Sequence, residues 1–246
     1  MIPKQGWINL YKPKNITSFK SINFIKKKFS IKKIGHAGTL DPMAEGILPI
    51  AIGKATKLIP YINIMKKEYE FTITWGSQTT TDDSQGKIIF ESNYFPTKTE
   101  IEKKINSYLG YINQIPPKVS AVKINGQRAY KLFRENKKFT IEPKKVFIEK
   151  LNITEHNTHK TSFKILCGKG FYVRSFARDF ALDLKTYGHI SSLKRSKVGK
   201  FTEKSSILLD DLLKIGQRHK EINCISPSIS MLDDILAYEI EEQLDI

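Results

Sequence analysis

A single carboxylate, Asp41, lies in a stretch whose other residues are mostly apolar or conformationally restricted. The stretch runs from Gly35 to Pro49 and reads GHAGTLDPMAEGILP. Because a proline disfavours the helical conformation in the residue before it, Pro42 predicts that Asp41 is extended on a stiff loop. A carboxylate held near apolar side chains needs a cation or hydrogen-bond donors to stay ionised. Such a group could serve as a nucleophile or as a general base.

The alternative is that Asp41 caps a helix, with Pro42 at the first helical position. Gly46 and Pro49 leave room for barely one helical turn after it. We therefore favour the loop, while the residues alone leave both interpretations open.

The chain offers little metal-binding chemistry. Asp82 and Asp83 are adjacent carboxylates with no third ligand nearby. His156 and His159 lie in a polar turn that supplies no further ligand, and the two cysteines lack a metal-type spacing. We therefore expect neither a metal nor a cofactor.

The elements around Asp41 follow from the periodicity of the sequence. Gly6–Lys12 reads as a strand ended by Pro13, and we interpret Lys12 as structural. The apolar spacing after Ser18 predicts a helix that Thr17 or Ser18 caps. The outer face of that helix is either solvated or in contact with phosphates, and the sequence leaves both open. Its basic residues are Lys20, Lys26, Lys27 and Lys28.

Four large side chains alternate with polar ones in the segment KEYEFTITWG, which predicts a half-buried strand. They are Tyr69, Phe71, Ile73 and Trp75, and we expect the aromatic rings to point inward. Tyr69 is either a core aromatic or a ring that stacks on a base while its hydroxyl reaches polar groups.

Arginine is rare in this chain, since it accounts for only six of the 41 basic residues. Where arginine persists, its planar fork can make contacts that lysine cannot. Arg174 lies where a strand is expected to give way to a helix that Ser175 caps and Gly188 ends. Side chains at such corners project into clefts, so Arg174 is a candidate partner for Asp41. The alternative is a surface ion pair on that helix.

The charge balance points to a polyanionic partner. Lys and Arg number 41 against 25 Asp and Glu, a formal net charge of +16. A general lysine bias of the proteome is the alternative cause. The N-terminus lacks a continuous apolar segment and nowhere do 18 apolar residues follow one another, so we expect a cytoplasmic protein that does not enter membranes.

Residues from about 113 to 145 combine basic and aromatic side chains in a way that suits phosphate contacts and base stacking. The alternative is a solvated charged helix. The candidate RNA-contacting residues are Lys118, Lys123, Arg128, Tyr130 and Arg134.

The segment around Asp41 resembles the active-site signature of bacterial tRNA pseudouridine-55 synthases, His-x-Gly-x-Leu-Asp-Pro-x-Ala-x-Gly-x-Leu, at every fixed position. Further matches extend over nearly the whole chain. They are Lys12-Pro13, the pattern from Ser120 to Arg134, Tyr172-x-Arg174, and Ser192 to Ser196 with the following Val198-Gly199.

This resemblance implies an enzyme that flips a T-loop uridine of tRNA out of its stack and isomerises it to pseudouridine without a cofactor. It implies a mixed α+β fold, with a central, mainly antiparallel sheet flanked by helices and an inserted RNA-binding arm. It further implies that Arg174 pairs with the catalytic Asp41, that Tyr69 lies in the active site and that His36 enters the folded RNA loop. Tyr172 belongs to the same motif as Arg174, and Leu193 is expected to line the pocket.

We expect one catalytic domain over residues 1–222, with the arm inserted at about 113–145, in a protein that is monomeric. A helical tail is expected over 223–246, and the further small RNA-binding domain of many family members is expected to be absent. At Thr79-Thr80-Thr81 the chain departs from the family's Thr-Asp-Thr, which puts any contact of the missing acid in doubt.

Two other classes remain as alternatives. The Gly-x-x-Gly at Gly35 to Gly38 with a basic surface suits a KH-like RNA binder, but that loop normally leads into a helix. Asp41, Asp82 and Asp83 could instead serve a metal-dependent nuclease, which would be sensitive to chelators and would shorten RNA.

Overall fold

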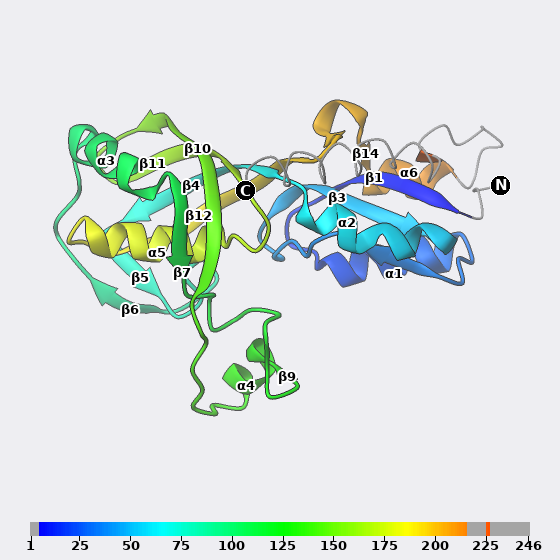
Figure 1. The fold of residues 1–246 in the computed structure, drawn as a ribbon, viewed down its shortest axis with the longest axis horizontal. Helices are drawn as coiled ribbons and strands as arrows, with labels where there is room; N and C mark the ends of the chain where they lie inside the picture. Colours follow the sequence, from blue (N-terminus) through cyan, green and yellow to red (C-terminus); the bar gives the residue numbers. More distant parts are fainter. Residues whose placement is uncertain (1–4, 216–224, 227–246) are drawn as a thin grey trace. The chain divides into compact units, whose positions relative to one another are not determined.

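The computed structural model describes residues 5–215 and 225–226 (Figure 1). The chain forms two compact units, one of Met1–Tyr69 with Lys194–Ile246 and one of Glu70–Leu193. It passes from one unit to the other within β4 (Lys67–Trp75) and returns within β12 (Gly188–Val198). Apart from residues 225–226, the helical tail expected over 223–246 lies outside the described residues.

In the first unit, β1 (Gly6–Lys12) pairs with three strands. It runs antiparallel to β3 (Glu45–Ile52) along its whole length. It runs parallel to β14 (Ile207–Leu208) and antiparallel to β15 (Ile225–Ser226). Every residue of β1 except Tyr11 is buried, as expected for a strand enclosed on both faces.

The other neighbours of β3 bring distant segments beside the Asp41 loop. β2 (Ile34–His36) runs antiparallel to β3, and Lys194 and Arg195 of β12 pair with its first residues in parallel. β13 (Phe201–Thr202) pairs antiparallel with the end of β12. Because β2 and β3 pair with each other, the loop that joins them begins and ends on neighbouring strands.

Helices complete the first unit, and the first one begins as the sequence predicts. Thr17 accepts a hydrogen bond from the Lys20 amide at 3.0 Å, while Ile22 and Ile25 are buried. The helices of this unit are α1 (Ser18–Lys28), the 3₁₀ turn η1 (Gly53–Leu58), α2 (Ile59–Ile64), the 3₁₀ turn η3 (Glu203–Ser205) and α6 (Leu209–Ile215).

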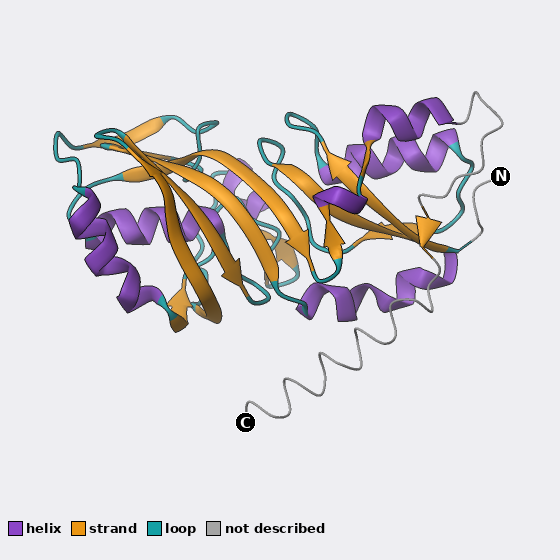
Figure 2. Ribbon diagram, turned by 90° about the horizontal axis from the view of Figure 1, so that it is seen from above, coloured by secondary structure: helices purple, strands orange, loops and turns teal. Residues whose placement is uncertain are grey.

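The second unit is built on the strand order β12-β4-β11-β10-β7. β10 (Lys144–His156) runs antiparallel to β7 (Gly110–Gln114) and to β11 (Lys160–Cys167), with two irregularities in the latter ladder. Helix α5 (Val173–Asp183) lies along a face of this sheet (Figure 2). Its Phe176 contributes to the core of the unit and contacts aromatic side chains of the sheet. The fold class expected from the sequence, α+β with a mainly antiparallel mixed sheet, is confirmed.

Aromatic rings hold α5 to the sheet. Phe71 of β4 stacks on Phe163 of β11 with ring centroids 5.3 Å apart, and both meet Phe176 edge-on. Phe180 stacks on Phe176 at 5.0 Å. Each such pair contributes about 0.5–1.5 kcal/mol beyond the free energy gained by burying its surface. These contacts therefore fix the first turn of α5 against the sheet.

Smaller elements extend from this sheet. The loop between β7 and β10 projects from the edge of the sheet and forms the arm (Figure 1). The remaining elements of the unit are β5 (Ser77–Thr79), β6 (Ile88–Glu91), α3 (Lys98–Ile105), the 3₁₀ turn η2 (Asn106–Tyr108), β8 (Lys123–Ile124), β9 (Gln127–Arg128) and α4 (Ala129–Arg134).

Two predicted helix boundaries of α5 are wrong. Tyr172, not Ser175, is the residue before the first helical turn, and the Ser175 hydroxyl donates to the Ile115 carbonyl at 2.7 Å instead. The helix ends at Asp183, five residues before Gly188, which is the first residue of β12. The Ser175 hydroxyl therefore makes a long-range hydrogen bond in place of the helix cap that the local sequence pattern predicts.

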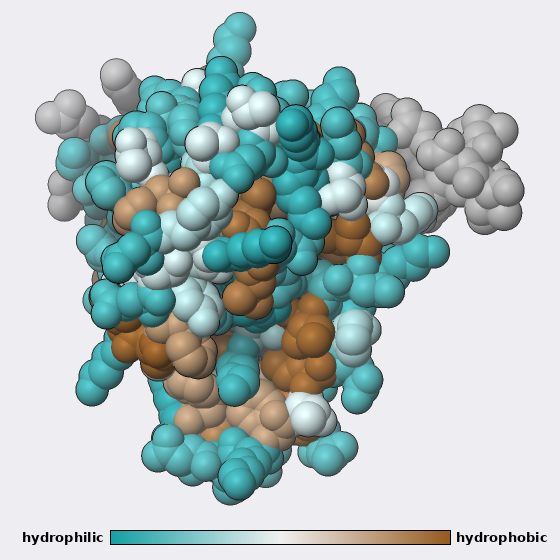
Figure 3. All heavy atoms as spheres, turned by 90° about the vertical axis from the view of Figure 1, so that its left-hand side faces the viewer, coloured by the Kyte–Doolittle hydropathy of each residue, from teal (hydrophilic) through white to brown (hydrophobic). Residues whose placement is uncertain are grey.

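The surface seen in Figure 3 is mostly hydrophilic, with separate hydrophobic areas between the charged side chains. The exposed hydrophobic side chains of the second unit include Ile88, Ile89 and Phe90 of β6. Among the residues that the structure describes, no helix has the length and apolar character to span a membrane.

Candidate active site

Asp41 lies on a tight turn between β2 and β3. The Ala44 amide donates to the Asp41 carbonyl at 3.1 Å, and the chain enters β3 at Glu45 without forming a helix. Asp41 is half-buried, whereas Leu40 is 3% and Met43 7% exposed. The loop interpretation is confirmed and the helix-cap alternative is wrong.

Ser18 fixes the residue before Asp41. Its hydroxyl donates to the Leu40 carbonyl and accepts from the Leu40 amide, both at 2.9 Å, and the serine is 1% exposed. On the other side of the turn, the Asn15 amide donates to the Pro42 carbonyl at 2.7 Å. The backbone on both sides of Asp41 is thus tied to α1 and to the loop before it.

Lys12 lies next to this turn and is fully buried, with 0% exposure. Its ammonium donates to the carbonyls of Pro13 at 2.7 Å and Ile16 at 2.8 Å, and it lies 3.5 Å from the carbonyl of Pro42. Burial lowers the pKa of Lys12 from 10.5 to about 8, although the negative charge of Asp41 acts in the opposite direction. A residue interpreted as structural therefore also brings a cation into the field of Asp41.

His36 is the last residue of β2 and pairs with Ile50 of β3, so it does not project from a free loop. It is half-buried, and its Nδ1 is buried with no hydrogen-bond partner in the described part of the chain. Burial lowers its pKa, and the positive charge of Arg195 lowers it further. The ring is therefore neutral near pH 7.

Tyr69 differs from the other large side chains of β4. Phe71, Ile73 and Trp75 are buried, with 2%, 0% and 3% exposure, whereas Tyr69 is half-buried. The inward orientation predicted for the strand is confirmed for these three. The intermediate exposure of Tyr69 leaves part of its ring accessible, as stacking on a base requires.

Arg174 is 5% exposed on the first turn of α5 in the second unit. It donates to the Thr81 carbonyl and to the Val119 carbonyl, both at 3.0 Å, and lies 3.7 Å from the Asp83 carboxylate. Arg174 thus ties the loop after β5 and the start of the arm to α5. The ion pair considered as the alternative for this helix, between Arg178 and Asp179, is also present, at 2.8 Å.

Asp82 and Asp83 stabilise their own loop. Asp83 accepts from the Thr81 hydroxyl at 2.6 Å, and Arg178 contacts the Asp82 carboxylate at 3.2 Å. Burial raises the pKa of Asp82, against the lowering effect of Arg178. In the described part of the chain no three His, Cys, Asp or Glu residues cluster in a way that could hold a metal ion.

Tyr172 and Leu193 belong to the same unit as Arg174. The backbone of Tyr172 exchanges two hydrogen bonds with the Gln114 side chain, at 2.8 and 3.0 Å, so the corner before α5 is fixed to the end of β7. Leu193 is 4% exposed on β12. Asp41, Tyr69 and His36 belong to the first unit.

The arm presents all five of its predicted contact residues to solvent. Lys118, Lys123, Arg128, Tyr130 and Arg134 are all exposed. The Arg134 guanidinium lies 5.7 Å from the centre of the Tyr130 ring, and Arg128 donates to a backbone carbonyl of the arm itself. Tyr130 and Arg134 lie on α4, and the other basic residues lie in the segments before it, so the arm combines charged groups with an aromatic ring, as phosphate contact with stacking requires.

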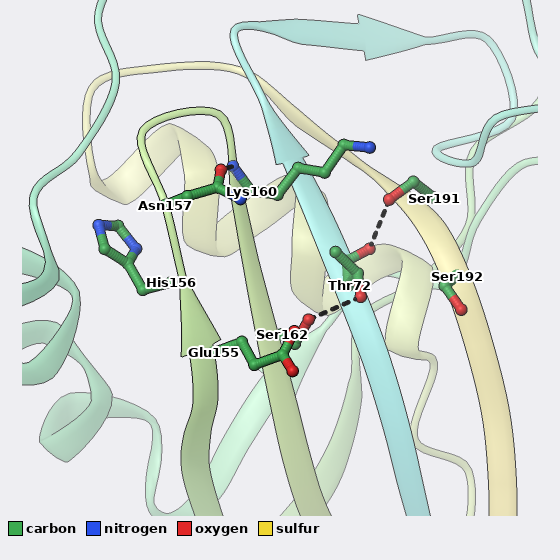
Figure 4. Close-up of a pocket in the computed structure, with 8 residues that line it drawn as sticks. All are labelled: Thr72, Glu155, His156, Asn157, Lys160, Ser162, Ser191 and Ser192. Atoms are coloured by element: carbon green, nitrogen blue, oxygen red, sulfur yellow. Dashed lines mark hydrogen bonds between the residues drawn. The ribbon is translucent and has the colours of Figure 1, made fainter.

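A polar cavity of about 550 Å³ lies on the second unit, over β4, β10, β11 and β12 (Figure 4). Thr72 and Ser162 share a hydrogen bond of 2.9 Å there, and Ser191 donates to the Thr72 carbonyl at 3.3 Å. None of the residues that line it was predicted to be functional. The residues that line it are Thr72, Glu155, His156, Asn157, Lys160, Ser162, Ser191 and Ser192.

Comparison with known proteins decides the family. The family model described as TruB family pseudouridylate synthase, N-terminal domain, matches residues 26–173. A tRNA pseudouridine synthase B of Ehrlichia chaffeensis is 42% identical over 94% of this chain and 78% of its own length. The chain belongs to the TruB family of pseudouridylate synthases.

Other relatives agree with this assignment. A tRNA pseudouridine synthase B of Wolbachia pipientis is 46% identical over 93% of this chain, which spans 64% of that relative's length. A chain of a crystallised Cbf5-Nop10-Gar1 complex superposes with a TM-score of 0.72 and 26% identity, covering 92% of this chain and 60% of that one. The expected pseudouridine synthase fold is confirmed.

Sequence reasoning underrated three residues that hold the TruB signature loop. The sequence predicts a structural role for Lys12, offers Ser18 beside Thr17 as a candidate helix cap, and places Arg195 in a family-like motif without giving it a role of its own. Arg195 is 2% exposed and donates to carbonyls on both sides of Asp41. The scarcity of arginine was the signal that could have found it.

Proposed function

We propose that this chain isomerises a uridine to pseudouridine at position 55, in the T-loop of tRNA. Membership of the TruB family and the names of its relatives support the reaction class. The observation that carries the proposal is the turn of Asp41, a half-buried carboxylate fixed by Ser18 and beside the buried ammonium of Lys12.

The reaction rearranges bonds within one nucleotide. The glycosidic bond from C1′ to N1 breaks, the base turns, and C1′ bonds to C5. The hydrogen on C5 leaves as a proton and N1 gains one, so atoms balance and nothing is oxidised or reduced. Asp41 supplies the anionic group, as nucleophile or base, that this sequence needs.

The other proposed site residues act on the base or on the charge of Asp41. Tyr69 stacks on the extruded base, and His36 enters the space that the base leaves, which offsets an unstacking cost of a few kcal/mol. Arg174 favours the ionised form of Asp41. Tyr172 and Leu193 line the pocket.

The arm provides the grip on RNA. Lys118, Lys123, Arg128 and Arg134 contact phosphates of the T-arm, and Tyr130 stacks against it. The catalytic domain extends over residues 1–222, with this arm inserted at about 113–145. The enzyme acts as a monomer in the cytoplasm, where its tRNA substrate is made, and uses no cofactor.

Release of tritium from C5 of uridine tests this proposal directly. An unmodified tRNA transcript labelled at C5 should lose one tritium per molecule when treated with the wild-type protein. A transcript with cytidine at position 55 and labelled uridine elsewhere is the control and should lose none. Equal release from both transcripts would refute the position, and no release from either would refute the activity.

A further inference from the structure

Three arginines of the described chain are largely buried, and one of them has different partners. Arg174 and Arg178 each lie within 4 Å of a carboxylate, at 3.7 and 3.2 Å. Arg195, which is 2% exposed on β12, forms no ion pair with any described residue. Burying a guanidinium without a carboxylate costs folding free energy unless its N–H groups donate to other acceptors.

The partners of Arg195 are two backbone carbonyls of the Asp41 loop. Its Nε donates to the Ile47 carbonyl at 2.8 Å, and its Nη2 donates to the Gly38 carbonyl at 3.0 Å. Gly38 lies three residues before Asp41 and Ile47 lies six after it. One rigid planar fork therefore joins the two ends of the loop that carries the carboxylate.

Two glycines of the loop lie close to Arg195, Gly46 against its backbone and Gly38 against its guanidinium. A Cβ at Gly46 would lie 2.3 Å from the carbonyl oxygen of Arg195, and a Cβ at Gly38 would lie 3.2 Å from its Nη1. Both glycines have positive φ, +107° and +82°. The signature glycines on either side of Asp41 thus lie where the loop backbone passes too close to Arg195 for a larger residue to fit without a shift.

The charge of Arg195 also reaches the other groups of the loop. It lowers the pKa of His36 and of Lys12, in each case after burial as the larger cause. No described carboxylate contacts Arg195 and neutralises its charge. Its positive charge therefore acts on the groups of the loop around it.

We propose that Arg195 is a positioning residue for the isomerisation, holding the Asp41 loop at both ends through its bonds to the Gly38 and Ile47 carbonyls. The proposal rests on the proposed function for its effect on rate. In this role Arg195 acts through the position of Asp41 and the positive charge that it places near His36, not by contact with the substrate.

The test compares Arg195→Met, which removes fork and charge, with Arg195→Lys, which keeps the charge but reaches only one carbonyl. Lys197→Met, at an exposed position of the same strand, is the matched control. We expect Arg195→Met to slow single-turnover tritium release about 10²-fold, since small displacements of a reacting group cost that much. The dissociation constant for tRNA should change less than about threefold, because no phosphate contact is lost.

A second readout separates positioning from loss of stability. In NMR titrations the pKa of His36 should rise in Arg195→Met and stay near the wild-type value in Arg195→Lys, since only the former loses the charge. If Arg195→Met does not fold, Arg195→Lys carries the test, with a smaller loss of rate and unchanged tRNA binding.

An unchanged rate in a folded Arg195 variant, an equal loss of rate and tRNA affinity, or an unshifted His36 pKa in folded Arg195→Met would each overturn this inference. Failure of the wild-type protein to release tritium would instead refute the proposed function. The His36 titration would still decide whether Arg195 controls that ring.

Discussion

Around Asp41 the groups that hold the backbone are buried, with Lys12 at 0%, Ser18 at 1% and Arg195 at 2% exposure. In the arm between β7 and β10 the charged groups are exposed. One region fixes a carboxylate through interior hydrogen bonds, and the other presents its charged side chains to solvent. Rates depend steeply on the position of a reacting group, whereas affinity for a nucleic acid depends on the number of phosphates neutralised.

The largest effect should come from Asp41→Asn, which keeps the turn but removes the negative charge. We expect turnover to fall on the order of 10⁴-fold or more, because the group that acts in the reaction is lost. Binding of tRNA should stay close to wild type. Substantial release of tritium by this variant, measured at the same RNA occupancy, would contradict the role of Asp41.

The next largest effect should come from Lys12→Met, which leaves the carbonyls of Pro13 and Ile16 without their donor. We expect turnover to fall about 10²-fold because the Asp41 turn loosens. Lys14→Met is the control, since Lys14 is exposed and its ion pair among the described residues is with Glu45. Equal activity of the two variants would count against a role for the buried ammonium.

Lys12 also predicts a dependence of stability on pH. Its pKa is about 8 in the folded protein and 10.5 when unfolded, so the unfolded state binds more protons between these values. The free energy of unfolding of the wild-type protein should therefore increase, relative to that of Lys12→Met, as the pH rises from about 8 to 10.5. Below pH 8 the difference should be constant. Chemical denaturation of both proteins at a series of pH values measures it.

Ser18→Ala should have a moderate effect, because the amide and the carbonyl of Leu40 both lose their partner. We expect a destabilisation of about 1–3 kcal/mol and a loss of turnover of about tenfold. Ser21→Ala, on the same helix, is the matched control, since Ser21 is also buried but its hydroxyl donates to the Thr17 carbonyl within the helix and not to the Asp41 loop. Similar turnover losses in both variants would show that helix stability alone matters.

The smallest effect on rate should come from the arm. Lys118→Ala combined with Lys123→Ala should flatten the slope of log affinity against log salt by about 2, with turnover at saturating tRNA unchanged. Lys98→Ala with Lys103→Ala, exposed lysines of α3, is the control. An unchanged slope in the arm variant would exclude phosphate contacts by these two lysines.

Much of the local structure was predictable. β1 has the predicted bounds, the first helix starts as expected and Pro42 marks the turn of Asp41. These features depend on neighbours in the chain, namely alternation of apolar residues, a capping hydroxyl and the restriction that proline imposes. The two errors in α5 arose where a distant carbonyl competed for Ser175 and where Gly188 began a strand instead of ending a helix.

The sequence by itself determined that a lone carboxylate stands on a stiff loop, that arginines are few, and that the TruB signature surrounds Asp41. Only the tertiary structure decided what holds that loop. Ser18 reaches Leu40 across 22 residues, and Arg195 reaches Ile47 across 148. The sequence does not show which distant donor will bond to a given backbone carbonyl, because the packing of the folded chain selects that partner.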